Sequence, residues 1–178
     1  MISRLFRRTP QDDSIASLYG MIVAQARAPA FYQIYGVPDT VNGRLEMVML
    51  HAVLVLRQLE ASPGRALGQA LFDRFCRDMD ASMREMGVGD LAVPRKMQQI
   101  GQAFYGRQAA YRRALAEPPG EGESLLVAAL ERNVFAGVEK PEGAVRLARY
   151  VREADRRLVG AEFVGGQLPF PDPAQVPI

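Results

Sequence analysis

Few side chains in this chain could ligate a metal or attack a substrate. Its 178 residues include one histidine, His51, and one cysteine, Cys76. A zinc site usually draws several histidine, cysteine or carboxylate ligands from short spacings, and a Cys–His nucleophile needs both side chains within hydrogen-bond reach. Cys76 falls on the apolar face of a predicted helix, where an inert buried thiol is the usual outcome. These residues predict neither a metal site nor an enzyme.

Carboxylates are the other candidates. Four of them share one predicted helix, and paired helical carboxylates can hold two metal ions where Glu-x-x-His motifs accompany them. Those motifs are absent and arginines lie among the carboxylates, so we expect a solvated face of intrahelical ion pairs. The carboxylates are Asp73, Asp78, Asp80 and Glu85. One alternative with a cofactor stays open, because His51 and a methionine could ligate haem in a helical bundle.

The elements that must position these residues show helical periodicity almost throughout, and no stretch shows the two-residue alternation of a half-buried strand. We predict an all-α fold, a single compact bundle of about six or seven helices with an extended proline-rich C-terminal tail. A basic arm at 1–13 precedes one helical domain at 14–164, with a candidate internal boundary at 118–123, and the tail covers 165–178. The tail is either docked through Leu168 and Phe170 or loose. We expect helices over about 14–28, 29–36, 41–60, 65–87, 94–117, 124–135 and 144–159.

Charge and hydropathy narrow the class of protein. The formal net charge of +2 is too small to indicate a nucleic-acid binder. The longest apolar run, Met47–Leu56, is about half of the ~20 residues that a membrane-spanning helix needs. A single cysteine fits a reducing compartment.

Two turns that contain glycine separate predicted helices. The first follows the aromatic residues Phe31, Tyr32 and Tyr35, so this block is either an architectural corner or the rim of a binding site. The turn residues in the two places are Gly36, Pro38 and Asp39, then Gly87, Gly89 and Asp90. Gly36 can end a helix in the left-handed conformation, and Asp39 or Thr40 can cap the next helix.

Two further patterns point to surfaces. The block 103–111 places Phe104, Tyr105 and Arg107 around Gly106, and a mid-helix glycine often marks a close approach of a neighbouring backbone. The last predicted helix carries an arginine set that is either an ordinary solvated face or a basic patch for phosphate groups. That set is Arg146, Arg149, Arg152, Arg156 and Arg157.

In this order, the blocks resemble the ubiquinol-cytochrome c chaperone family, the assembly factors of respiratory complex III. The resemblance runs from about Leu18 to Leu115 and is carried by three blocks. They read LYGMIVAQARAPAFYQIYGVPDTVNGRLEMVMLH, QALFDRFCRDMDASMREMGVGDLAVPRKM and AFYGRQAAY. The resemblance implies an all-helical, non-enzymatic chaperone without a cofactor that binds newly made cytochrome b. A long targeting extension of the mitochondrial type is absent, which suggests a bacterial-type member in the cytoplasm, peripheral at the inner membrane.

On that basis we expect an apolar, methionine-containing groove with cationic groups beside it. The expected partner-binding residues are Phe31, Tyr32, Tyr35, Arg44, His51, Phe104, Tyr105 and Arg107. A second assembly factor, the ribosome and an anionic membrane surface stay open as further partners, whereas specific DNA is not expected. The alternatives in function are a helical-bundle haem or quinone carrier and a ribosome- or nucleic-acid-associated module.

Overall fold

Helix α3 (Val41–Leu59) forms the centre of the molecule, which we describe from a computed structural model. The structure describes residues 10–60, 64–136, 138, 141–163 and 165–176. Every residue of α3 from Glu46 to Leu56 is buried, as expected of a helix that is apolar around most of its circumference. The other helices of the described residues are α1 (Pro10–Ala26), α2 (Pro29–Gln33), α4 (Arg65–Glu85), α5 (Val93–Ala116), α6 (Glu121–Asn133) and α7 (Pro141–Leu158). The all-α prediction is confirmed.

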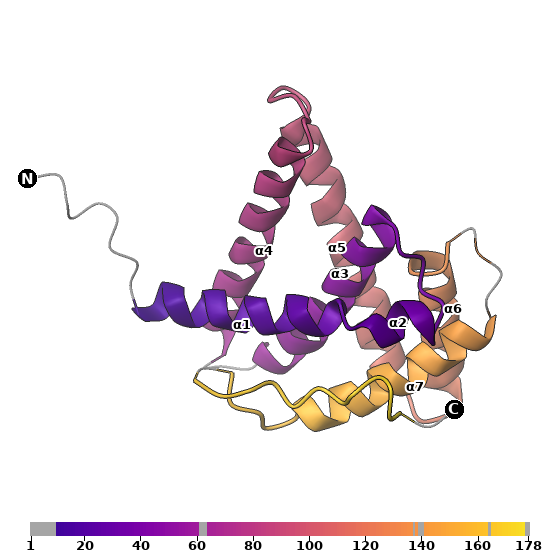
Figure 1. Cartoon of the computed structure of the whole chain (residues 1–178). Coiled ribbons are helices and arrows are strands. Elements are labelled where there is room, and N and C mark those ends of the chain that lie inside the picture. The colour runs from indigo at the N-terminus through magenta and orange to yellow at the C-terminus, as the bar shows by residue number, and fades with distance from the viewer. Residues whose placement is uncertain (1–9, 61–63, 137, 139–140, 164, 177–178) are drawn as a thin grey trace, which may run out of the picture.

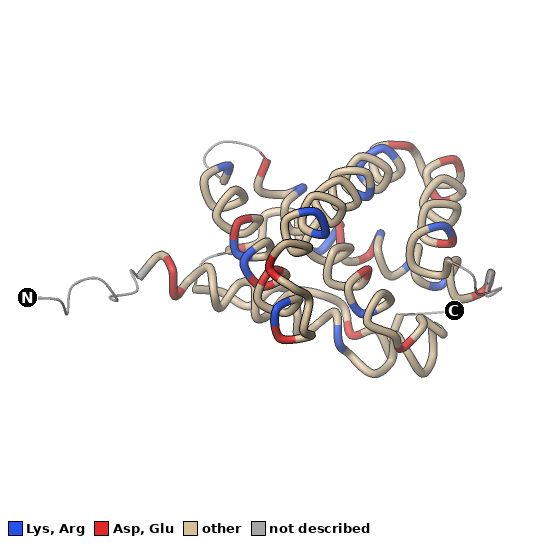
Figure 2. Tube along the Cα trace, turned by 90° about the horizontal axis from the view of Figure 1, so that it is seen from above, with Lys and Arg blue, Asp and Glu red and all other residues tan. Residues whose placement is uncertain are grey.

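Helices α1, α4, α5 and α7 pack directly on α3. Helix α1 packs on α3 and α4, and the consecutive helices α5, α6 and α7 pack on one another, with α7 returning to α3. Helices α4 and α5 form a hairpin that leans away from the rest, so its connecting loop is the far point of the molecule at the top of Figure 1. Basic and acidic residues are intermixed over the helices and do not gather on one side (Figure 2).

Local signals set the first predicted turn. Gly36 has φ 71°, the left-handed conformation that a side chain would strain. Thr40 caps α3, because its Oγ1 accepts a hydrogen bond from the Gly43 backbone N–H at 3.0 Å. The carbonyl of Pro38 accepts from the Thr40 N–H at 2.9 Å. Asp39 instead pairs with Arg44, its Oδ1 lying 2.6 Å from Nε.

The second turn joins α4 to α5. Gly87 has φ 80° and ends α4, as its sequence position predicted. Gly89 does not have a positive φ, and its carbonyl accepts from the Ala92 N–H at 2.8 Å at the start of α5. Asp90 forms an ion pair with Arg84. The turn is thus fixed by one left-handed glycine and one ion pair across the end of α4.

Several boundaries differ from the prediction. Helix α1 begins at Pro10, so the last part of the predicted basic arm is helical, and residues 1–9 of that arm lie outside the described residues. Helix α6 begins at Glu121 and not near 124. Two glutamates in its first turn interact favourably with the positive end of the helix dipole and so stabilise this earlier start. Helices α5 and α6 pack directly on each other across the 118–123 link.

The close approach expected at Gly106 is wrong. A Cβ added at Gly106 would have no neighbouring atom within 4 Å. Gly122 is a crowded glycine, where a Cβ would lie 2.4 Å from the Ala114 carbonyl oxygen and 2.2 Å from Nη2 of Arg152. Gly122 therefore permits α6 and α7 to approach the end of α5.

None of the helices in the described part of the chain is long and apolar enough to cross a membrane.

Candidate functional site

The aromatic corner of the sequence lies in the protein core. Phe31 from α2 touches His51 of α3 and Tyr150 of α7, with ring centroids 5.4 and 4.8 Å apart and edge-to-face geometry. Tyr35 joins them, its ring centroid 5.4 Å from that of Phe31. All four rings are at most 1% exposed. Phe31, Tyr35 and His51 thus belong to the core that holds α2 against α3 and α7.

His51 is the polar centre of this cluster. The Met47 carbonyl, 2.7 Å away, can only accept, so Nδ1 carries the proton and donates. Nε2 then accepts from the Tyr150 hydroxyl at 2.8 Å, and that hydroxyl accepts from the Gln25 side-chain amide at 2.9 Å. Burial lowers the pKa of His51 to about 4. Both ring nitrogens are thereby engaged within the core, so this arrangement offers no nitrogen to a haem iron.

The proline-rich tail closes the same cluster, which decides between the docked and loose alternatives. The ring of Phe170 packs edge-on against His51, with centroids 5.2 Å apart. Gln25 donates to the Pro171 carbonyl at 3.0 Å, and the Tyr35 hydroxyl donates to the Pro173 carbonyl at 2.8 Å. Through residue 176 the tail is a docked strap.

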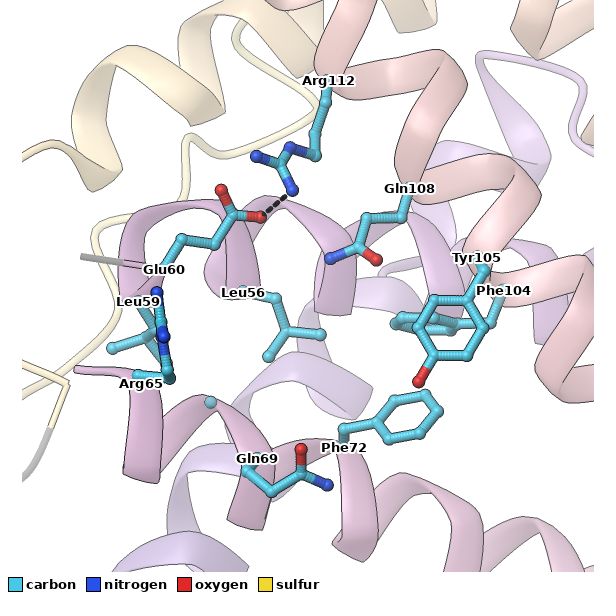
Figure 3. A pocket seen from close by; sticks show the side chains of 11 residues that line it. Leu56, Leu59, Glu60, Arg65, Gln69, Phe72, Phe104, Tyr105, Gln108 and Arg112 are labelled. Atoms are coloured by element: carbon cyan, nitrogen blue, oxygen red, sulfur yellow. Dashed lines mark ion pairs between the residues drawn. The ribbon is translucent and has the colours of Figure 1, made fainter. Parts of the chain in front are cut away.

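The second aromatic block lies elsewhere. Phe104 of α5 is buried between Phe72 and Phe75 of α4, with ring centroids 5.0 and 5.1 Å away. Tyr105 is 58% exposed and packs on Phe72 at 5.5 Å. Figure 3 shows the rings of Phe72, Phe104 and Tyr105 lining a pocket whose upper rim carries the ion pair between Glu60 and Arg112. The two aromatic blocks therefore belong to different sites.

A different hollow matches the expected apolar surface. Two adjoining cavities of about 380 and 390 Å³ lie between the first half of α3, the end of α4 and the start of α5, and they share Leu45, Met83, Met86 and Ile100. We call this hollow the methionine groove. Its remaining apolar lining is Val41, Val48, Met49, Met79, Val88 and Ala103. Four methionines thus line one continuous surface, and Met86 is 58% exposed.

Charged side chains flank and underlie the groove. Arg27, Arg44, Lys96 and the acidic Glu85 line its edges. On its floor Arg107 holds the buried Glu46 by two hydrogen bonds, 2.6 Å from Nε to Oε2 and 2.5 Å from Nη2 to Oε1. Burial raises the pKa of Glu46, and the Arg107 guanidinium opposes that rise. Arg107 thus completes the floor by compensating a buried carboxylate.

Of the expected partner-binding residues, Arg44 and Arg107 lie at the methionine groove. Tyr32 is half-buried at the end of α2, where its hydroxyl donates to the Ala26 carbonyl at 2.9 Å. The residues that the sequence reasoning did not assign to a site are chiefly Leu45 and Ile100. Both lie on the apolar faces of amphipathic helices, at positions typical of a buried core. Periodicity does not show whether another helix packs over such a position or leaves it facing a groove.

The arginine set of α7 is largely engaged within the molecule. Arg152 donates to the Ala114 carbonyl at 3.0 Å, and Arg156 and Arg157 both pair with Glu153. Arg146 lies over the Tyr35 ring, 5.7 Å from its centroid, and donates to the Ile34 carbonyl at 3.3 Å. Only Arg149 makes no ion pair or hydrogen bond with the described residues. These contacts support the solvated-face alternative over a phosphate-binding patch.

Comparison with known proteins identifies related chains. A family model described as "Ubiquinol-cytochrome C chaperone" matches residues 33–161. A solved structure, the crystal structure of the Cbp3 homolog from Brucella abortus, is 36% identical, with a TM-score of 0.84, over 99% of this chain and 100% of that chain. No curated protein matches the chain significantly.

Proposed function

The chain belongs to the ubiquinol-cytochrome C chaperone family, and from this premise we propose that it binds newly made cytochrome b in the methionine groove. Its broader role is that of an assembly chaperone for ubiquinol-cytochrome c reductase, respiratory complex III. We propose that it acts without catalysis, at the cytoplasmic face of the membrane into which cytochrome b is inserted.

The observation that carries this proposal is the continuous apolar lining of the groove, to which four methionines contribute. Cytochrome b is built from apolar helices, and an unassembled apolar helix needs a surface that shields it from water. Leu45, Met83 and Ile100 offer such a surface at the meeting of three helices. Methionine side chains are unbranched and repack easily, so the groove can adapt to segments of different shape.

The charges beside the groove fit the same client. Arg27 and Lys96 lie at its edges. Cations in these positions can meet the polar ends of a membrane segment or the headgroups around it. The charges of Glu46 and Arg107 on the floor compensate each other in an ion pair, so this pair presents no unpaired charge to a client. The groove is therefore apolar toward a client, and its rim carries the cations Arg27 and Lys96 together with the exposed acid Glu85.

A substitution at Met86 tests the groove. Met86→Glu puts a charge where an apolar client would pack, and since Met86 is exposed the fold should persist. We expect the apparent affinity for cytochrome b to fall at least about tenfold, measured by co-purification from cells. Complex III content should fall in the same strain.

Val159→Glu is the matched control, because Val159 is 66% exposed just after α7 and does not line the groove. It should leave cytochrome b capture unchanged. Tyr105→Ala tests the pocket of Figure 3 separately, since Tyr105 is the exposed aromatic of the predicted partner-binding set. If Met86→Glu captures cytochrome b like the unaltered chain while Tyr105→Ala does not, the client site is that pocket and the groove proposal is wrong.

A further inference from the structure

The docked strap lies on the outer side of the helices, beside α7 (Figure 1). It covers a groove whose walls come from separate elements. Gln25 of α1, Tyr35 after α2 and His51 of α3 contact the strap directly. Tyr150 of α7 lies behind them and is hydrogen-bonded to Gln25 and His51. We call this the strap groove, and aromatic-lined grooves of this kind are usual receptors for extended proline-rich segments.

The hydrogen bonds of the strap groove match the chemistry of proline. A proline has a carbonyl acceptor but no backbone N–H to donate. The groove supplies donors, since the Gln25 amide donates to the Pro171 carbonyl at 3.0 Å. The Tyr35 hydroxyl likewise donates to the Pro173 carbonyl at 2.8 Å. Both prolines are buried and Asp172 between them is exposed, so the groove contacts alternate residues of an extended chain.

The backbone of the docked strap is not part of any ladder with the helices. Its backbone hydrogen bonds are local, from the Phe170 N–H to the Leu168 carbonyl and from the Gln175 N–H to the Asp172 carbonyl. Among the described residues, no backbone-to-backbone hydrogen bond joins residues 165–176 to a helix. Side chains alone therefore hold the strap, as in a complex between a protein and a short peptide.

Charge does not hold the strap either. The hollow between the strap and α7 is lined by two cations, Arg149 and Arg157, and by two acids, Glu153 and Asp172. Arg157 already pairs with Glu153. No ion pair joins Asp172 to another described residue, and its Oδ1 accepts from the Ala174 N–H at 2.9 Å. The attachment is thus apolar and hydrogen-bonded, and salt should affect it little.

Glycines join the docked strap to α7. Gly160 has φ 74° and Gly165 has φ 77°, conformations that other residues rarely adopt. The helices also contact one another without the strap, since α1 and α7 both pack on α3. Rotation of the backbone at these glycines can therefore release the strap while the helices keep their mutual contacts, which is local opening rather than unfolding.

We propose that the strap groove is a peptide-recognition site and that the docked strap is its ligand, bound within the same chain. The ligand class is an extended segment in which an aromatic residue is followed by prolines one and three positions later, as Phe170 is by Pro171 and Pro173. The strap leaves and re-enters the groove as a unit while the helices stay folded. Its tether keeps its local concentration high, so it excludes a free copy of the same segment. This site is separate from the methionine groove, and its test does not involve cytochrome b.

A labelled peptide tests the strap groove in solution. A peptide of residues 165–176 with a fluorophore on its N-terminus is titrated with the full-length chain and followed by fluorescence anisotropy. Phe170→Ala in the full-length chain weakens its own strap, so this variant should bind the peptide at least about tenfold more tightly than the unaltered chain. A peptide that itself carries Phe170→Ala should bind the variant at least about tenfold more weakly. Gln175→Ala in the peptide, at an exposed position, is the matched control and should change nothing.

Tyr35→Phe locates the bound peptide, because it removes the donor to Pro173 and keeps the ring. Introduced into the full-length Phe170→Ala chain, it should lower the affinity for the peptide about fivefold, the net effect of one hydrogen bond. An unchanged affinity would place the peptide on another part of the chain and overturn the proposal.

Circular dichroism of the full-length variants shows whether the helices persist when the strap is weakened. Leu168→Ala is a second strap variant, since this half-buried side chain also lies outside the helices. If both Phe170→Ala and Leu168→Ala lose their helices, the strap is part of one cooperative core and the proposal is wrong. Folded variants that do not bind the peptide saturably would also contradict it. Either failure leaves the Met86→Glu and Val159→Glu comparison of cytochrome b capture unaffected.

Discussion

His51 is kept neutral by its position in the core. Its two ring nitrogens are engaged by the Met47 carbonyl and the Tyr150 hydroxyl, and the rings of Phe31 and Phe170 pack against it. Charging such a residue costs free energy, because the imidazolium would lose water and face a hydroxyl that must turn to accept. The pKa of His51 accordingly falls to about 4.

A pH dependence of stability follows at the residue scale. In the unfolded chain a histidine titrates near 6.5, so below about pH 6.5 the unfolded state takes up a proton that the folded state does not. The free energy of unfolding should therefore decrease as the pH falls toward the folded pKa of about 4, with a limiting slope of about 1.4 kcal/mol per pH unit. Urea unfolding at about pH 7.5 and about pH 5 measures this decrease.

His51→Gln is the matched variant, because glutamine can still donate and accept hydrogen bonds but does not titrate. It should be less stable at neutral pH and should lose the part of the pH dependence due to His51, the only histidine in the chain. An equal slope in the variant and the unaltered chain would show that other groups carry the pH dependence.

At the scale of elements, two glycines inside helices have opposite surroundings. Gly122→Ala should destabilise the protein by about 1–3 kcal/mol, because the added Cβ collides with the end of α5 and with Arg152. Gly106→Ala should stabilise it by up to about 1 kcal/mol, since alanine is the better helix former and the site is open. Thermal unfolding of both variants gives the comparison, and a Gly122→Ala protein as stable as the unaltered chain would contradict the tight approach.

The elements themselves were largely predictable from the sequence, because their ends are marked by local signals. Thr40 caps one helix and Gly36 and Gly87 end two others through short-range geometry. The neighbours of a glycine were not predictable in this way. Gly106 and Gly122 differ only in what another helix places against them, and that packing depends on residues far away in the chain.

The apolar, adaptable character of the candidate site could be predicted from the sequence, but its position in the fold could not. The methionines of α4 recur at helical spacing, and the sequence predicted an adaptable apolar surface from them. Periodicity alone does not distinguish a buried stripe from one that faces a groove. Phe104 and Tyr105 show the same limit, since they are adjacent in sequence yet one is buried and the other is 58% exposed.

At the scale of the whole molecule, the tail contributes to stability. Deletion of the chain from Leu168 onward should lower the free energy of unfolding by several kcal/mol, about 1 kcal/mol for each hydrogen bond and more for the apolar contacts of Phe170. Tyr35→Phe removes only the hydrogen bond to Pro173 and should cost about 1 kcal/mol. Denaturant unfolding measures both. A truncated protein that unfolds like the full chain would show that the docked strap carries no stability.

The docked strap also has a consequence for the order of biosynthesis. The ribosome makes Phe170, Pro171 and Pro173 after all the helices whose rings they cover, and the contact from Tyr35 to Pro173 spans 138 positions of sequence. Folding during translation proceeds from the N-terminus, so every helix can be in place while the Phe31–His51–Tyr150 cluster is still open on one side. The core is closed only after the strap has left the exit tunnel, and a nascent chain stalled at the end of α7 should therefore be more sensitive to protease than one that includes Pro173.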